Sequence, residues 1–87
     1  MNTSTEAIKL LQESIQKVQA SQDVVDNLIA VHDYQDVTSL VIQSAEALLH
    51  SAIAFMQSED ENALDLVDSA EDLLEAMYNV IEGDLDS

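Results

Sequence analysis

The sequence predicts an all-α fold, a three-helix antiparallel bundle, from three observations. Apolar residues recur at steps of three and four along most of its 87 residues, which is the spacing of one face of an α-helix. Pro is absent and Gly occurs once, whereas strands and long loops usually need more turn residues. Short polar connections interrupt the apolar pattern twice. We therefore expect three helices, at about 4–31, 37–57 and 59–82.

The first expected helix begins at a capping box, in which the Thr3 hydroxyl accepts a first-turn amide and Glu6 reaches back. Ser21 could instead cap a new helix starting at Gln22, so a break near Ser21 is the alternative. If the helix is continuous, its apolar residues follow a heptad rhythm through Ile8, Leu11, Ile15, Val18, Val25 and Ile29.

The second expected helix is the centre of the molecule, because residues 37–56 carry a single charge, Glu46. Asp33 or Asp36 is the expected cap at its start. A surface helix needs one apolar stripe, and a helix that is apolar over most of its circumference is buried. We therefore expect other helices or a second copy of the chain to cover it. The expected core or dimer face is Leu48, Leu49, Ala52, Ile53, Phe55 and Met56, with Val41 of the same series left unassigned.

The same apolar stretch is long enough to be considered as a membrane span. Polar residues interrupt it throughout, and neither end carries the Lys or Arg anchors of membrane helices. We therefore expect no membrane segment. The third expected helix starts at a second capping box, Ser58 to Glu61, after a tight turn. Gly83 is the residue expected to end it in a left-handed conformation.

The helix pattern predicts one domain over residues 1–87, with frayed ends at 1–3 and 84–87. Helices two and three form the expected hairpin, and helix one is expected to pack across both. A three-helix monomer does not easily surround so apolar a central helix, and short chains gain missing core by association. We therefore expect a homodimer.

The charge is strongly negative: two basic residues stand against 18 acidic ones, for a formal net charge of −16. Residues 1–22 are neutral in sum, and residues 23–87 contain no Lys or Arg. We expect no direct binding to nucleic acid, because a protein needs Lys and Arg to neutralise the phosphates. An anionic membrane would repel the chain. A basic protein is the partner that this charge would attract.

Acidic residues form one stripe along the third helix, with steps of three, four and seven. The stripe spans about 30 Å, and neighbouring carboxylates lie roughly 5–6 Å apart. A solvated polar face is the simple interpretation of such a stripe. The functional interpretation is a surface that engages a basic groove. The expected partner-binding residues are Glu61, Asp65, Asp68, Glu71, Asp72, Glu75 and Glu82.

No catalytic or cofactor motif is visible, so we expect neither enzyme activity nor a cofactor or metal. His50 lies in a helix, as phosphotransfer histidines do, but Ala52 and Ile53 occupy the places where that family has Lys and Gly. We expect His50 to pair with Glu46 instead. The chain has no Cys, and with no basic, apolar leader at its start we expect a cytoplasmic location.

Two functional hypotheses follow. Small size and acidity resemble the class of phage or mobile-element counter-defence proteins, anti-CRISPR-like or DNA-mimic-like, that occupy the groove of a nucleic-acid-binding protein. The alternative is an acidic helical chaperone or adaptor that binds a partner helix through its apolar face.

Overall fold

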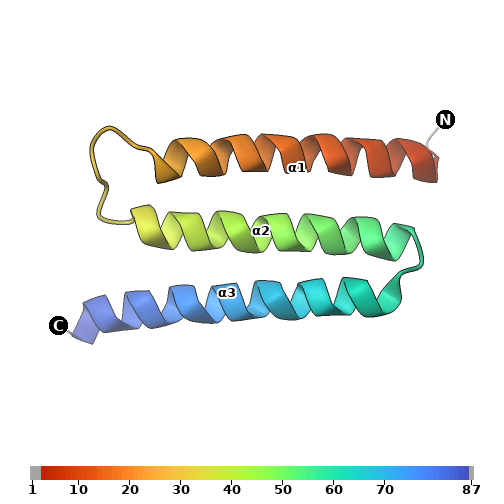
Figure 1. Ribbon diagram of the computed structural model, residues 1–87. Helices are drawn as coiled ribbons and strands as arrows, with labels where there is room; N and C mark the ends of the chain where they lie inside the picture. Colours follow the sequence, from red (N-terminus) through yellow and green to blue (C-terminus); the bar gives the residue numbers. More distant parts are fainter. Residues whose placement is uncertain (1–2, 87) are drawn as a thin grey trace.

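The computed structural model describes residues 3–86 as three antiparallel helices. They are α1 (Ser4–Asp26), α2 (Gln35–Met56) and α3 (Asp60–Asp86) (Figure 1). No strand occurs in this part of the chain. The predicted all-α, three-helix antiparallel fold is therefore confirmed; Met1, Asn2 and Ser87, three of the residues expected to fray, lie outside the described residues.

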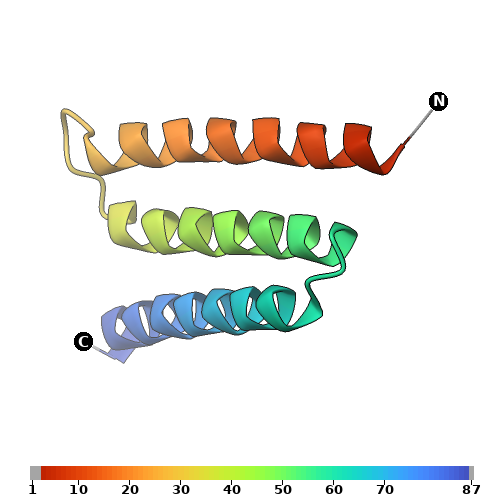
Figure 2. The same cartoon turned by 45° about the vertical axis from the view of Figure 1, so that its right-hand side comes forward.

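The three helices lie side by side in one layer, with α2 in the middle (Figures 1 and 2). Within the described chain α1 contacts α2 and α2 contacts α3, whereas α1 and α3 do not touch. The molecule measures 51 × 28 × 17 Å, and its smallest dimension is about one and a half times the diameter of one helix with side chains, about 10–12 Å. The expectation that helix one packs across both others is wrong. Because α2 is apolar around most of its circumference, it accepts a neighbour on two opposite sides.

The Thr3 cap of α1 is confirmed, because the Glu6 amide donates to the Thr3 hydroxyl at 3.1 Å. The helix is continuous through Ser21, whose hydroxyl donates to the Lys17 carbonyl. It ends at Asp26 instead of residue 31. At about 1.5 Å per residue its 23 residues match the 22 of α2, so a longer α1 would have no neighbour to pack on.

The connection between α1 and α2 begins at Asn27, whose side-chain amide donates to the Asp23 carbonyl. The Tyr34 amide donates to the ring Nδ1 of His32 at 3.0 Å, which closes the turn before α2. Tyr34 is the N-cap residue and makes no side-chain cap bond, so capping by Asp33 or Asp36 is not observed. Asp36 instead lies in the first turn, where the helix dipole favours an acid.

The turn between α2 and α3 is a Schellman motif. The Ser58 amide donates to the Phe55 carbonyl at 3.0 Å, and the Glu59 amide donates to the Ala54 carbonyl at 2.8 Å. Ser58 has φ 60, in the left-handed region that usually takes Gly. The expected Ser58 capping box is therefore wrong: Ser58 ends α2 and does not cap α3. The first helical amide bond of α3 runs from Ala63 to the Glu59 carbonyl.

The end of α3 also differs from the prediction. Gly83 has no positive φ and stays inside the helix, which continues to Asp86. Nothing lies within 4 Å of a Cβ built at Gly83. Gly83 is therefore an ordinary, exposed helical position and not a helix terminator.

The interior of the layer is thin and built from small side chains. The buried apolar residues are Ile15, Ala54, Ala63 and Ala70, and no large side chain in the described chain is fully buried. Ser44 and Ser51 are buried on α2, and their hydroxyls donate to the backbone one turn earlier. The predicted burial of α2 is thus incomplete: neighbours cover two of its sides. By length and composition α2 could cross a membrane, a test that the central helix of a water-exposed bundle also passes.

Candidate interaction surfaces

Four rows of residues, each repeating every seven positions, divide the surface of α2. Residues of the first row bond to α1: the Glu46 carboxylate accepts from Gln19 at 2.9 Å, and the Ser39 hydroxyl accepts from Gln22 at 2.6 Å. Ser44 and Ser51, about half a turn round the helix, belong to the buried side toward α3. The two remaining rows face out of the layer in opposite directions, so each open side of the molecule has its own chemistry.

One open side is polar along α2, where its row is Asp36, Gln43, His50 and Gln57. Two shallow grooves flank His50. The groove toward α3 has a volume of about 430 Å³ and includes Asn62 and Leu66, and the groove toward α1 has about 420 Å³ and includes Gln12 and Gln16. We call this side the polar face.

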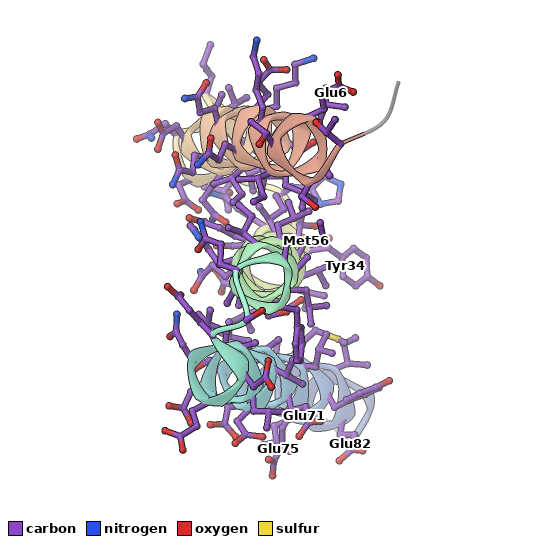
Figure 3. The ribbon with its side chains drawn as sticks, turned by 90° about the vertical axis from the view of Figure 1, so that its right-hand side faces the viewer. Glu6, Tyr34, Met56, Glu71, Glu75 and Glu82 are labelled. Atoms are coloured by element: carbon purple, nitrogen blue, oxygen red, sulfur yellow. The ribbon has the colours of Figure 1, made fainter. Side chains whose placement is uncertain are left out.

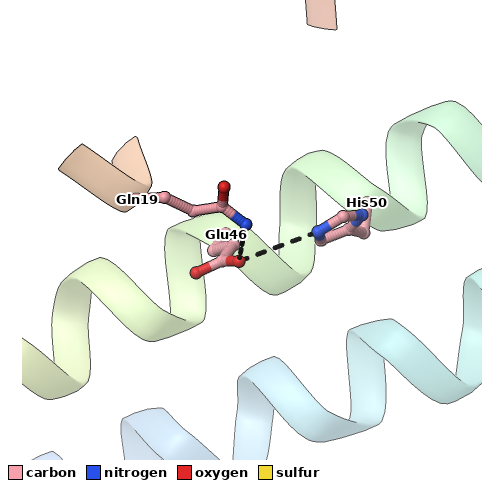
Figure 4. Close-up of polar contacts among 3 residues, drawn as sticks. All are labelled: Gln19, Glu46 and His50. Carbon is pink, nitrogen blue, oxygen red and sulfur yellow. Dashed lines mark hydrogen bonds and ion pairs between the residues drawn. The ribbon is translucent and has the colours of Figure 1, made fainter. Parts of the chain in front are cut away.

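His50 on the polar face pairs with Glu46, as expected. Its Nε2 lies 3.8 Å from the Glu46 carboxylate, which Gln19 also contacts (Figure 4). Within the described chain this is the one contact between a carboxylate and a potentially cationic group, and it is an ion pair only when His50 is protonated. Glu46 therefore joins α1 to α2 and positions His50, which is an ordinary structural role for a half-exposed pair.

The other open side is apolar along α2. Its row is Val41, Leu48 and Phe55, each two residues from a polar-face residue and hence about half a turn away. These side chains are 43%, 44% and 47% exposed. Gln12 of α1 and Leu66 of α3 line the grooves on the polar face. Leu10 and Leu64 each lie two residues from one of them, about half a turn round the helix, and therefore point to the apolar side. We call the apolar face the set Leu10, Val41, Leu48, Phe55, Leu64 and Tyr78. On α3, Glu71 lies between Leu64 and Tyr78 in the same seven-residue row, so an exposed acid borders this face.

The predicted acidic stripe forms the outer edge of α3. Asp68 and Asp72 lie two residues on either side of the buried Ala70, so they point away from α2. Figure 3, which looks along the layer, shows Glu71, Glu75 and Glu82 on the same outward side. All seven members are exposed. We call the acidic ridge the set Glu61, Asp65, Asp68, Glu71, Asp72, Glu75 and Glu82.

The charge of the layer is lopsided. α3 contains ten Asp or Glu and no Lys or Arg, whereas α1 contains both lysines of the chain and four acids, for a net −2. Among the described residues no cation lies within 4 Å of a ridge carboxylate. Like charges at i,i+4 destabilise a helix by a few tenths of a kcal/mol each. The ridge thus carries repulsion that the fold itself does not relieve.

The structure separates the six residues predicted as one core or dimer face. Leu48 and Phe55 lie on the apolar face and Met56 is also exposed, whereas Leu49, Ala52 and Ile53 are half-buried. The connection after α1 is a surface that sequence reasoning missed: Leu28, Ile29, Val31 and Tyr34 are all exposed there. Its signal in the sequence is the apolar run after Asp26, whose helical period predicts a continuation of helix one.

No group of three or more His, Asp or Glu in the described chain is arranged to hold a metal ion. The exposed surfaces with a distinct composition are the acidic ridge, the apolar face, the polar face and the connection after α1. Comparison with protein-family models, with curated proteins and with solved structures gives no match for this chain.

Proposed function

We propose that this protein is a non-enzymatic interaction module of the cytoplasm that inhibits a basic, nucleic-acid-binding protein by placing its acidic ridge in the nucleic-acid groove. One observation carries the proposal: seven exposed carboxylates line the outer edge of α3 without a neutralising cation. Their spacing along the helix, roughly 5–6 Å, is close to the phosphate spacing along a nucleic-acid strand.

The position of the ridge supports this proposal. It lies on an edge of a thin layer, directly opposite the α2 contact, so nothing in the described chain stands between it and a groove. Arg and Lys side chains of a groove would neutralise the ridge and remove its internal repulsion. Binding would therefore remove the electrostatic repulsion among the ridge carboxylates of the free protein. Charge complementarity would also raise the association rate.

The experiment is a charge reversal with a matched control. Wild type serves as bait in lysate at low and high salt, and association of the most enriched basic protein is then measured directly. Asp65, Asp68 and Asp72 are changed together to Lys, which shifts the net charge from −16 to −10. We expect association at least about 10-fold slower, mimicking the effect of added salt. Duplex nucleic acid should compete with wild type for the same partner.

The control variant changes Glu13, Asp23 and Asp33 to Lys, which gives the same net charge and leaves the ridge intact. Under the proposal it keeps most of the wild-type association rate. Equal losses in both triple variants would mean that only net charge matters, and unchanged binding by a folded ridge variant would remove the ridge as the contact surface.

The apolar face favours a second candidate function, an adaptor that binds an amphipathic helix. Exposed Leu and Phe side chains aligned along α2 are the kind of surface that such a helix contacts. An adaptor of this type would bind with little dependence on salt, because its contacts are apolar. The salt series of the same experiment therefore separates the two functions.

A further inference from the structure

The apolar face leaves this molecule without the second layer that a domain needs. Domains bury the apolar sides of their helices between two packed layers. Here the single layer has three large side chains in a row on α2, each more than two-fifths exposed, and no large side chain fully buried in the described chain. The layer therefore ends at an apolar surface where a core would be expected.

We propose that a second copy of this chain packs on the apolar face, giving a two-layer, six-helix dimer whose two-fold axis runs parallel to α2. The two α2 helices then lie face to face and parallel, and α3 of each copy lies over α1 of the other. This goes beyond the ridge function, which needs no partner copy.

The accessible area agrees with a missing layer. The chain exposes 6229 Å², whereas a compact monomer of 9.5 kDa exposes about 5,000 Å². The excess, roughly 1,200 Å², is more than the approximately 800 Å² that each partner buries in a standard interface. A second copy therefore has enough surface to cover, and it brings an identical apolar row to cover it.

Charge selects the orientation of the second copy. Face-to-face packing allows two in-plane axes, one parallel to α2 and one perpendicular to it. The perpendicular axis would stack α3 on α3, which brings two helices with ten acids each together. The parallel axis stacks α3 on α1, which holds both lysines and a net charge of −2. It also sends the two acidic ridges to opposite edges of the dimer.

The register follows from the axis. With parallel α2 helices each residue of the row meets its own copy: Val41 meets Val41, Leu48 meets Leu48 and Phe55 meets Phe55. With the perpendicular axis centred on Leu48, Val41 would meet Phe55 instead. Two Val41 residues would then lie about 21 Å apart, twice the seven-residue spacing along a helix.

Single cysteine substitutions test this register directly, because the chain has no Cys of its own that could form a competing disulfide. Val41→Cys and Phe55→Cys are oxidised separately and run on non-reducing gels. We expect each to form a covalent dimer by itself, since a disulfide requires Cα atoms within about 7 Å. Gln43→Cys, on the polar face, is the matched control and should stay monomeric on the gel.

Light scattering of wild type gives the mass independently, with twice 9.5 kDa expected. Leu48→Asp should weaken the dimer about 100-fold or more and keep its helicity, because Leu48 is exposed in the single copy. Added salt should tighten the dimer, the opposite of its effect on ridge binding. A monomeric mass at every concentration overturns the proposal, and crosslinking only in a mixture of the two cysteine variants overturns the parallel axis.

Discussion

At the scale of single residues, Ser58 illustrates how one sequence pattern serves two structures. S-x-x-E before an apolar run predicts a capping box, and the acids that follow Ser58 reinforce that interpretation. In the structure Ser58 instead ends α2, because the two amides after Gln57 donate to carbonyls in the last turn of α2. A sequence pattern contains no information on φ, so the left-handed conformation of Ser58 could not be predicted.

The role of Ser58 gives a prediction with a definite sign. A non-Gly residue in the left-handed region costs roughly 1 kcal/mol, and Gly relieves that cost. Ser58→Gly should therefore stabilise the fold by about 0.5–1 kcal/mol and raise Tm by roughly 2–8 °C. Thermal denaturation followed by circular dichroism measures the change.

The matched control is Ser58→Ala, which keeps the left-handed strain and removes only the hydroxyl. It should leave Tm nearly unchanged, since the Ser58 side chain makes no hydrogen bond within the described chain. If Ser58 were an N-cap, Ala would cost about 1 kcal/mol and Gly would bring no gain. A lower Tm in both variants would thus restore the capping interpretation.

At the scale of elements, the sequence predicts the three helices well and their ends poorly. Apolar spacing places α2 and α3 within a few residues of their observed starts. The error at the end of α1 has a physical cause: the apolar residues after Asp26 continue the helical period but have no neighbour to pack on, and Ile29 is fully exposed. Apolar periodicity predicts which side of a helix is apolar, whereas the length of the helix also depends on the neighbouring helix on which it packs.

The two helix interfaces differ in kind. Gln22, Ser39 and Asp26 form a hydrogen-bonded group where α1 meets α2, with Ile15 the one buried large residue of α1. Between α2 and α3 the buried residues are Ala and Ser, which let two helices approach closely. The second interface depends on the small size of its residues, a feature that hydrophobic patterning alone does not identify.

That difference leads to a prediction for Ala70, which is 1% exposed. Ala70→Leu adds three carbons to a contact without space, so it should destabilise the fold by about 1–3 kcal/mol. Ala20→Leu makes the same chemical change at an exposed position of α1 and should be nearly neutral. Urea denaturation of both variants gives the two free energies. Equal stability would mean that α2 and α3 are not closely packed at Ala70.

At the scale of the whole molecule, the sequence predicts the acidic stripe and its outward direction, because both follow from helical period and charge. It does not predict the single layer. The spacing of apolar residues predicts that each helix has an apolar side, but it does not predict whether another helix of the same chain covers that side. Both α1 and α3 pack on apolar sides of α2, and Val41, Leu48 and Phe55 are still exposed. Those residues are where an additional partner has to be sought.

The net charge of −16 makes the stability of this layer dependent on salt. Neighbouring ridge carboxylates, roughly 5–6 Å apart, lie within the Debye length of about 10 Å at 0.1 M salt, so added salt screens their repulsion. We expect the Tm of wild type to rise with ionic strength. Reversing Asp65, Asp68 and Asp72 to Lys should raise Tm at low salt by about 4–8 °C. The three new i,i+3 or i,i+4 pairs, with Glu61, Glu71 and Glu75, contribute about 1 kcal/mol in total.

The same reversal should flatten the salt dependence, because three of the six repulsive i,i+3 or i,i+4 pairs of the ridge become attractive and offset the repulsion that remains. The Glu13, Asp23 and Asp33 triple variant has the same net charge but leaves the ridge intact, so its Tm should keep most of its dependence on salt. Calorimetry from 10 mM to 1 M salt compares the three proteins. A wild-type Tm that does not change with salt would show that the ridge carries no repulsion, and the fold would then provide no energetic reason for it to seek a cationic partner.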